Sequence, residues 1–413
     1  MIPVKRISLR MTDPRAIAID DYNYELPDDR IAQYPLAQRD ASKLLVYKNG
    51  TISDRVFREL PEELPAGSIA VFNTTKVVRA RMILQRESGA RIELFCTDAA
   101  DRSIDFSRIL HQTGQAEIRA FVGNAKRWKE QETLTLQHDH LVLKATKVAP
   151  VDDQWKVLLQ WTPDLQFSEV LDIIGNIPLP PYMNREEEEE DQERYQTVFA
   201  QQPGSVAAPT AGLHFTEHVL QQLRDKKIST AEVCLHVGAG TFKPVKSDTM
   251  EDHIMHREQI VVSYELIEQL IAHHGQTVIA VGTTALRTLE SLYWFGRQLV
   301  LEPGRFHDQL FVDQWDPYQA GPDVNPVVAL RTIKDWMREY NRNELRGYTQ
   351  LLIAPGYQFK IANALITNFH QPRSTLLLLV AAFTNNNHQR IYQHALDNNY
   401  RFLSYGDSSL LFR

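Results

Sequence analysis

Two loops of small residues each present a single histidine. They are Gly204–Glu217, GSVAAPTAGLHFTE, which carries His214, and Leu235–Val245, LHVGAGTFKPV, which carries His236. Imidazole titrates near neutral pH and can exchange protons with a substrate, and small neighbours let the backbone approach a ligand closely. Either loop alone could equally be a tight turn around a hydrogen-bonded core histidine. Two such loops so near each other favour a binding site with His214 and His236 as its catalytic candidates.

Hydroxyls and glycines in the same loops complete this candidate site. Threonine offers a hydrogen bond without bulk, and glycine leaves room for a ligand. The candidate ligand-binding residues are Thr210, Gly212, Gly238, Gly240 and Thr241. The two glycines Gly238 and Gly240 do not form a dinucleotide-binding fingerprint, because Lys243 stands where its third glycine belongs.

A third group of titratable residues is Asp252-His253, followed by His256. On a helix, His253 and His256 would share a face and could bind a metal ion with a third ligand such as His236. The alternative is a polar segment whose histidines form ordinary hydrogen bonds. Two histidines without a clear third ligand favour that alternative, so we expect no metal and keep Asp252 and His253 as reserve acid–base candidates.

The strand-like run TVIAV leads through Gly282 into a helical pattern that begins at Thr283 and Thr284. The free N–H groups of a helix N-terminus attract anions, and Arg287 one turn later could bind a carboxylate or phosphate through two N–H groups. The commoner arrangement is a capping threonine with a surface arginine. We treat Thr283, Thr284 and Arg287 as candidate substrate-binding residues.

Another candidate follows the strand-like run Ala364–Thr367, where the chain reads Asn368-Phe369-His370. Loops that follow strands form the sites of α/β proteins. Phe369 could stack on a purine and Asn368 could read its edge. The alternative is a buried aromatic residue before a turn at Pro372.

Two short basic clusters are the candidates for RNA contact, since aromatic stacking combined with cations suits single-stranded RNA. The whole chain has a formal charge of −7 and a pI of about 6.1, so its overall charge does not mark a nucleic-acid binder. Such clusters are more often solvated surface. The candidate residues are Lys76, Arg79, Arg81, Lys126, Arg127, Trp128 and Lys129.

Composition sets the remaining limits. A chain of 413 residues with 43% hydrophobic residues can form two or three domains. The two cysteines, Cys96 and Cys234, match neither a disulfide framework nor a cysteine zinc site. The longest apolar run, Leu376–Phe383, is too short to span a bilayer. We expect a cytoplasmic protein without membrane contact and, by default, a monomer.

The elements that position these residues fall into two kinds. Short alternating runs fill the region from Arg79 to Trp161, which is typical of a small barrel or sandwich. From Val206 onward, helical and strand-like runs alternate, including one expected strand at Arg401–Tyr405. We predict a multi-domain α/β protein, in which a larger α/β/α domain contains an inserted small β-barrel domain. The predicted parts are 1–76 (with 1–20 as a surface extension), 77–172 for the barrel, and 173–413, with an elaboration of no clear pattern at 300–346.

Several long motifs occur in an order that resembles a known family. They are YELPDDRIAQYPLAQRDASKLLV, VFNTTKVVRAR, ERYQTVFA, GSVAAPTAGLHFTE, LHVGAGTFKPV, VIAVGTTALRTLES, APGYQFKIANALITNFHQPRSTLLLLVAAF and RFLSYGDSSLL. Together they resemble the S-adenosylmethionine:tRNA ribosyltransferase-isomerases of queuosine biosynthesis. Thr74, Arg79 and Gln371 depart from the pattern we expect for that family, which indicates a divergent branch.

The resemblance implies a barrel joined to a larger α/β domain, and it implies a reaction. The ribosyl group of S-adenosylmethionine moves to 7-aminomethyl-7-deazaguanine in tRNA and is isomerised to give epoxyqueuosine, while adenine and methionine leave. S-adenosylmethionine is then a consumed substrate, and no cofactor is implied. The alternatives are a non-catalytic RNA-binding relative, and an S-adenosylmethionine-dependent enzyme that acts on a small amine.

Our hypothesis for the site follows from the groups that this reaction needs. His214 and His236 would face the ribose and adenine, and Thr210 and Thr241 would bind the ribose hydroxyls. Arg287 would bind the methionine carboxylate or a tRNA phosphate.

Overall fold

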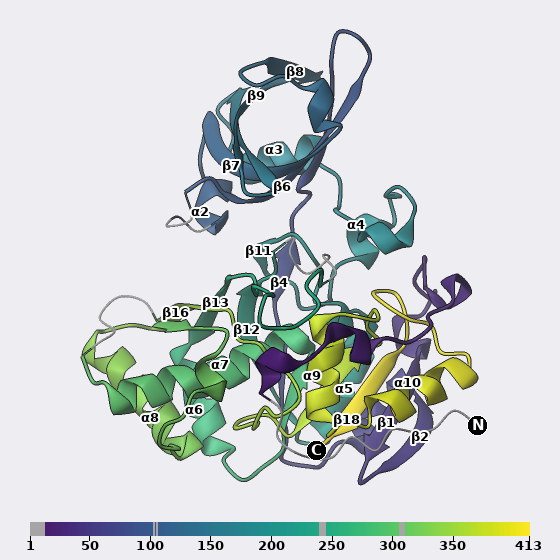
Figure 1. The fold of residues 1–413 in the computed structure, drawn as a ribbon, viewed down its shortest axis with the longest axis vertical. Helices are drawn as coiled ribbons and strands as arrows, with labels where there is room; N and C mark the ends of the chain where they lie inside the picture. The colour runs from purple at the N-terminus through teal and green to yellow at the C-terminus, as the bar shows by residue number, and fades with distance from the viewer. Residues whose placement is uncertain (1–12, 102–103, 105, 239–244, 305–309) are drawn as a thin grey trace. The chain divides into compact units, whose positions relative to one another are not determined.

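The computed structural model describes residues 13–101, 104, 106–238, 245–304 and 310–413. The chain folds into two compact units (Figure 1). The first comprises Met1–Phe72, His214–Val233 and Pro244–Arg413, and the second comprises Asn73–Leu213 and Cys234–Lys243.

The first unit is built on a ten-stranded mixed sheet. Strand β14 pairs in parallel with β3 and β17, whereas β18 runs antiparallel to β17 and parallel to β1. Strands β3, β14, β17 and β18 are buried along their whole length, as expected for strands covered on both faces. In sheet order the strands are β15 (Leu310–Val312), β16 (Glu344–Thr349), β13 (Glu258–Ser263), β12 (Ser229–His236), β3 (Ile69–Asn73), β14 (Val278–Val281), β17 (Ala364–Asn368), β18 (Ser408–Phe412), β1 (Lys43–Lys48) and β2 (Thr51–Val56).

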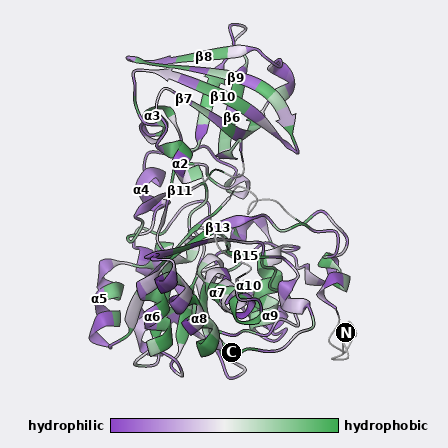
Figure 2. Cartoon of the chain, turned by 90° about the vertical axis from the view of Figure 1, so that its left-hand side faces the viewer, coloured by the Kyte–Doolittle hydropathy of each residue, from purple (hydrophilic) through white to green (hydrophobic). Residues whose placement is uncertain are grey.

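Most helices of this unit are amphipathic, and Figure 2 shows both hydrophobic and hydrophilic residues along α5 and α6. The start of α9 is capped, since Ser374 Oγ accepts a hydrogen bond from the Leu377 amide at 3.2 Å. The helices are α1 (Leu60–Glu63), α5 (Glu217–Asp225), α6 (Tyr264–Ala272), α7 (Thr283–Leu301), α8 (Pro326–Glu339), α9 (Thr375–Phe383) and α10 (His388–Asp397).

The second unit contains a six-stranded antiparallel barrel, in the order β5-β6-β7-β10-β9-β8. The edge strands β5 and β8 lie beside each other, so the sheet nearly closes (Figure 1). Alternating residues point inward and form the barrel core, as Ile92, Leu94 and Cys96 do on β6. The prediction of a mixed α/β fold with an inserted barrel is confirmed.

The barrel strands match the alternating runs of the sequence. They are β5 (Arg81–Gln85), β6 (Arg91–Ala99), β7 (Gln115–Gly123), β8 (Thr133–His138), β9 (Leu141–Val151) and β10 (Gln154–Thr162). The second unit also contains β4 (Thr75–Val77) and β11 (Gln202–Ser205), which pair in parallel, and the helices α2 (Phe106–Leu110), α3 (Phe167–Ile174) and α4 (Asp191–Arg194).

Two regions differ from the expectations. The described part of 300–346 contains regular structure: α8 packs against α6 and α7, and its start is capped by Asn325 with proline at the first turn. The expected strand at Arg401–Tyr405 is wrong, because Leu403 has a φ of 68° and the strand begins only at Ser408. Within the described ranges, no helix is long and apolar enough to cross a membrane.

Candidate functional site

Several predicted residues lie at one edge of the large sheet. The parallel strands β3, β14 and β17 all end there, and β14 leads into Thr283 and β17 into Phe369. Because β18 is antiparallel to β17 and parallel to β1, both β18 and β1 begin at this edge, at Ser408 and Lys43. Open α/β sheets bind ligands outside the carboxyl ends of their parallel strands. We call this the carboxyl edge, and it is the first candidate for the site.

His214 is buried at the carboxyl edge and is 5% exposed. Ser42 Oγ lies 3.1 Å from its Nδ1, and Asn368 Nδ2 lies 3.3 Å from its Nε2. If the Asn368 amide donates to Nε2, the ring proton sits on Nδ1 and points to Ser42. Burial, together with the nearby charge of Arg401, lowers the pKa of His214 to about 3. The ring is therefore neutral at physiological pH and acts best as a fixed hydrogen-bonding group.

His236 belongs to the second unit, where it lies at the end of β12 and is half-buried. Thr75 Oγ1 is 3.3 Å from its Nδ1, and Cys234 Sγ is 3.6 Å from its Nε2. Gly204 lies directly against the ring: a Cβ there would sit 2.6 Å from Nδ1, and its φ is 147°. A glycine is required at this position both by the contact and by the backbone conformation. His236 is thus a positioned histidine that is not fully buried.

The remaining residues of the two small-residue loops have mixed surroundings. Thr210 begins a short 3-10 helix, Thr210–His214. Gly212 is required by packing, since a Cβ there would lie 2.6 Å from the Phe199 ring. Among the described residues, no atom lies within 4 Å of the Cβ position of Gly238. Gly240 and Thr241 lie outside the described residues.

Helix α7 begins at Thr283 and Thr284, after Gly282, which has a φ of 92° and no side chain to cap the helix. Arg287 lies one turn further along and is 8% exposed, so it is not the surface arginine of the commoner arrangement. Its Nη1 pairs with the buried carboxylate of Glu258, and its Nε donates to the Leu351 carbonyl at 3.2 Å. Arg287 therefore has one buried nitrogen, Nη2, without a hydrogen-bond partner among the described residues.

The segment with Asp252 and His253 is not helical, so the shared helix face that a metal pair needs does not form. Asp252 is exposed, and His253 is half-buried. Burial lowers the pKa of His253, and His256 contributes to the same shift. The described residues contain no group of three His, Cys, Asp or Glu side chains that could hold a metal ion.

Phe369 packs into the interior of the first unit, and the neighbouring His370 is half-buried. The Phe369 ring is 1% exposed and contacts the rings of Tyr400 and Phe402. No face of this ring is open to a purine, so we leave Phe369 out of the proposals below. His370 Nε2 lies 3.0 Å from Thr367 Oγ1, and burial lowers its pKa to about 3.

A family model described as Queuosine biosynthesis protein matches residues 19–411. This chain belongs to that family. The crystal structure of an S-adenosylmethionine tRNA ribosyltransferase from Thermotoga maritima is similar to it, with 27% identity, 95% of this chain and 100% of that chain covered, and a TM-score of 0.45. The family match spans both units but begins after Ala18.

In this queuosine family protein the basic residues near the barrel fall into two groups. Arg79 donates to the Asp172 carbonyl and to Gln192, and Arg81 pairs with Glu93 at 3.0 Å. Lys76 is exposed on β4. The first cluster thus has two arginines that already bind protein groups.

The second basic cluster is more open, except at its tryptophan. Lys126, Arg127 and Lys129 are exposed. Trp128 is 1% exposed, and its indole N–H donates to the Glu132 carbonyl at 3.0 Å. The indole belongs to the barrel core and is not available to stack on a base. Within this second cluster, only the three cations remain candidates for RNA contact.

Sequence reasoning missed several residues that the fold brings to these positions. Each of them contacts a predicted site residue from a distant part of the chain. Ser42 contacts His214, Glu258 contacts Arg287, and Thr75 contacts His236. The motif RDASK did contain Ser42, but nothing in its sequence neighbourhood points to a histidine 172 residues away.

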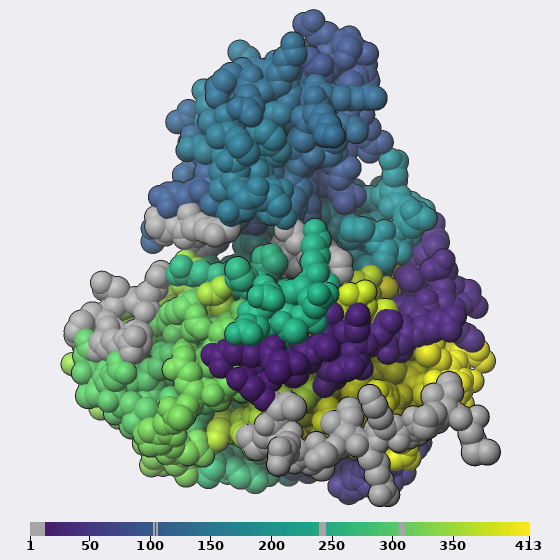
Figure 3. Space-filling view, in the orientation of Figure 1, coloured from purple at the N-terminus to yellow at the C-terminus, as the bar shows by residue number. Residues whose placement is uncertain are grey.

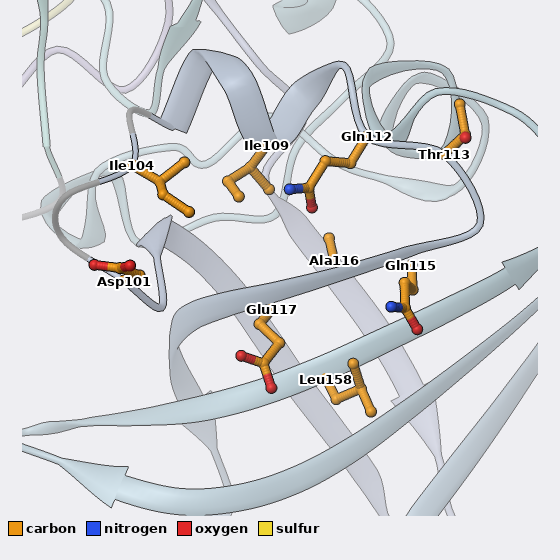
Figure 4. Close-up of a pocket in the computed structure, with 9 residues that line it drawn as sticks. All are labelled: Asp101, Ile104, Ile109, Gln112, Thr113, Gln115, Ala116, Glu117 and Leu158. Atoms are coloured by element: carbon orange, nitrogen blue, oxygen red, sulfur yellow. The ribbon is translucent and has the colours of Figure 1, made fainter.

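A cavity of about 470 Å³ lies on the barrel unit between α2 and β7 (Figure 4). Its lining combines the carboxylates of Asp101 and Glu117 with amide and apolar side chains. Glu117 is already paired with Lys156 at 2.7 Å. None of the predicted site residues lines this cavity, and acidic walls do not suit RNA phosphates, so we do not place the reaction there.

Proposed function

We propose that this member of the queuosine biosynthesis family transfers and isomerises the ribosyl moiety of S-adenosylmethionine onto 7-aminomethyl-7-deazaguanine in tRNA. The products would be epoxyqueuosine in the tRNA, adenine and methionine. The observation that carries the proposal is the family match over residues 19–411, which includes every motif on which the sequence resemblance depends.

The reaction sets three demands on the protein. The sulfonium acidifies the C5′ proton of S-adenosylmethionine, so a base must accept that proton. Adenine leaves more easily when its ring is protonated or hydrogen-bonded. The amine of the tRNA base must be unprotonated to attack. A group that titrates near neutral pH and reaches the substrate can meet the first two demands.

His236 is the better of the two histidine candidates for acid–base catalysis. It is half-buried, and Thr75 at 3.3 Å and the close backbone of Gly204 hold its ring. A general base must be both oriented and accessible, and His236 meets both conditions. Thr210 and Thr241 remain the proposed partners of the ribose hydroxyls.

His214 has a different role in this proposal. A pKa of about 3 makes its imidazolium too acidic to form at neutral pH. We assign His214 to positioning: it fixes the side chain of Asn368, which the carboxyl end of β17 presents at the carboxyl edge. Asp252 and His253 stay in reserve as acid–base candidates.

Arg287 is the proposed anion-binding residue. Its guanidinium is held by Glu258 and the Leu351 carbonyl, which leaves the buried Nη2 as a donor without a partner among the described residues. A methionine carboxylate would accept a charge-assisted hydrogen bond from that donor and gain from the helix N-terminus. The exposed cations Lys76, Lys126, Arg127 and Lys129 are the proposed contacts to tRNA phosphates.

The experiment is to measure adenine release from S-adenosylmethionine, with and without tRNA that carries 7-aminomethyl-7-deazaguanine. Release that requires this tRNA, together with the corresponding mass gain of the RNA, would support the proposal. Binding of tRNA without adenine release would indicate a non-catalytic relative. Release that is indifferent to tRNA but stimulated by small amines would indicate the amine-modifying alternative.

A further inference from the structure

The N-terminal residues Asp13–Ile19, which we call the strap, are paired with a segment more than 200 residues away. Met250 donates its amide to the Ile17 carbonyl at 3.0 Å, and Glu251 donates to the Arg15 carbonyl at 3.0 Å. The Ile19 amide donates to the Asp248 carbonyl at 3.1 Å, and Ala18 forms an antiparallel bridge with Thr249. The strap is therefore tied to 248–251 by three backbone hydrogen bonds and one isolated bridge, between the 3-10 turns Pro14–Ala16 and Ile19–Tyr22.

Apolar contacts also hold the strap. Ile17 is 7% exposed and Ile19 is fully buried, so these residues do not form the surface extension expected from the sequence. Their core cluster consists of Ile17, Ile19, Val245, Met250, Leu352, Ala354 and Leu378. The guanidinium of Arg15 lies 4.8 Å from the centre of the Trp315 ring. Figure 3 shows the dark purple N-terminal segment as an extended band across the first unit.

The segment beyond the paired residues is fixed from its other side by two glutamines. Gln314 accepts from the Met255 amide at 2.8 Å and donates to the His253 carbonyl at 2.7 Å. Gln350 donates to the Met255 carbonyl at 2.7 Å. The strap and these glutamines together hold 248–255, although this stretch contains no helix and only an isolated bridge.

We propose that the strap is a positioning element for the reaction, and that it sets the place of Asp252 and His253. The proposal rests on the proposed function, in which those two residues are the reserve acid–base candidates. The family match begins at residue 19, so the contacts made by Arg15, Ile17 and Ala18 come from chain outside that match.

The segment 248–255 needs the strap because an irregular segment has no hydrogen-bond ladder of its own to limit its motion. Each residue that becomes free gains conformational entropy, and segments with few buried contacts open locally far more often than a core does. Truncation before Ile19 would take away the two backbone hydrogen bonds to the Arg15 and Ile17 carbonyls, and it would remove Ile17 from the core cluster that contains Met250 and Val245. A displacement of about 1 Å at a catalytic group can lower a rate by roughly a hundredfold.

The test uses two variants of the full enzyme: one that begins at Ile19 behind an initiator methionine, and Ile17→Ser. In both, we expect the amides of Met250 and Glu251 to exchange hydrogen faster by at least tenfold. We expect kcat for adenine release to fall by roughly tenfold to a hundredfold, with KM for S-adenosylmethionine changed less than threefold. Ile17→Val keeps the apolar contact, so it should keep both the amide exchange rates and kcat close to those of wild type.

A matched control separates positioning from general destabilisation. Ile333→Ser removes a fully buried isoleucine of α8 in the same unit. It should lower the melting temperature as much as Ile17→Ser does, yet leave kcat close to wild type where the protein is folded. Equal losses of kcat in the two variants, or unchanged exchange at Met250 and Glu251 in the truncated protein, would overturn the proposal. The exchange measurement needs no activity, so an inactive wild type would count against the proposed function and not against the strap contacts.

Discussion

Asn368 Nδ2 lies 3.3 Å from His214 Nε2, although 154 residues separate the two in the chain. The contact links the end of a central strand to the loop of small residues that carries His214. It also uses one nitrogen of a ring whose other nitrogen faces Ser42 at 3.1 Å. Both ring nitrogens are thus engaged, and His214 is part of the framework of the carboxyl edge.

Replacement of His214 by alanine should therefore affect stability as well as turnover. The change leaves Asn368 and Ser42 buried without their imidazole partner, which costs about 1–3 kcal/mol. We expect kcat for adenine release to fall because Asn368 loses its orientation. His214→Gln can still donate and accept hydrogen bonds, so it should retain more of the stability and more of the turnover than His214→Ala does. The measurements are urea unfolding and adenine release.

The outcome that would contradict this role is a change in the pH profile. A neutral histidine with a pKa of about 3 adds no ionisation between pH 5 and 9. If His214→Gln removed an ionisation in that range from the kcat profile, His214 would be an acid–base catalyst. If turnover of His214→Ala equalled that of wild type, His214 would have no part in the reaction.

The depressed pKa of His214 also predicts how stability depends on pH. The unfolded chain binds a proton on this histidine near pH 6.5, whereas the folded protein does so only near pH 3. Between these values the unfolded state holds more protons, so the free energy of unfolding falls as the pH falls. His214→Gln should reduce the slope between pH 6 and 4. The exposed His218 is the control, because His218→Gln should leave the slope unchanged.

Substitution of Gly204 tests whether the position of the His236 ring matters for turnover. Gly204→Ala places a methyl group 2.6 Å from Nδ1 of His236 and imposes a side chain on a φ of 147°. The ring or the backbone must move, and we expect kcat to fall by roughly tenfold to a hundredfold. The measurement is single-turnover adenine release at saturating S-adenosylmethionine.

A control for backbone strain alone is available at Gly50, which has a φ of 76° and open space around its Cβ position. Gly50→Ala should cost about 1 kcal/mol of stability, as a non-glycine residue with positive φ does, and should leave kcat unchanged. Similar activity in Gly204→Ala and wild type would exclude His236 as a precisely positioned catalyst.

The parts of the fold that local pattern determines could be predicted from the sequence. Barrel strands alternate between an apolar interior and a polar exterior, so runs such as ARIELFC indicated β6 directly. The run TVIAV followed by Gly282 indicated β14 and the start of α7 in the same way. Helix α8 was missed because its amphipathic pattern lies among proline- and tryptophan-rich loops that have no pattern of their own.

The partners of the site residues could not be predicted, because they depend on tertiary packing. The sequence around Arg287 is compatible with a surface arginine, and only the approach of β13 supplies Glu258. The same holds for Trp128, whose basic neighbours indicated a nucleic-acid contact while its indole is enclosed by the barrel. The strap was missed for a similar reason, since its two buried isoleucines are too few to show a period.

The exposed cations of the barrel give a prediction about RNA binding. Lys126→Glu combined with Lys129→Glu should weaken tRNA binding and lower the slope of log K against log salt by about 0.7–0.9 for each phosphate that the protein no longer neutralises. Affinity for S-adenosylmethionine should be unaltered. Reversal of the exposed Lys144, on β9 of the same barrel, is the control for net charge. If reversal of Lys144 weakened tRNA binding as much, per unit of charge, as the change at Lys126 and Lys129 does, the response would be a general electrostatic one and these lysines would make no defined contact with the tRNA.

The buried pair of Arg287 and Glu258 leads to the last prediction. Glu258→Gln removes the charge that compensates a buried guanidinium, and breaking such a pair costs about 3–5 kcal/mol. In the presence of saturating methionine, part of that loss should be recovered, because the ligand carboxylate supplies a new negative charge to Nη2. Thermal unfolding with and without methionine measures this, and methioninol, which lacks the carboxylate, is the matched ligand control. If methioninol stabilises Glu258→Gln as much as methionine does, Arg287 does not bind the carboxylate. If methionine stabilises Arg287→Met as much as it stabilises Glu258→Gln, the ligand binds elsewhere in the protein.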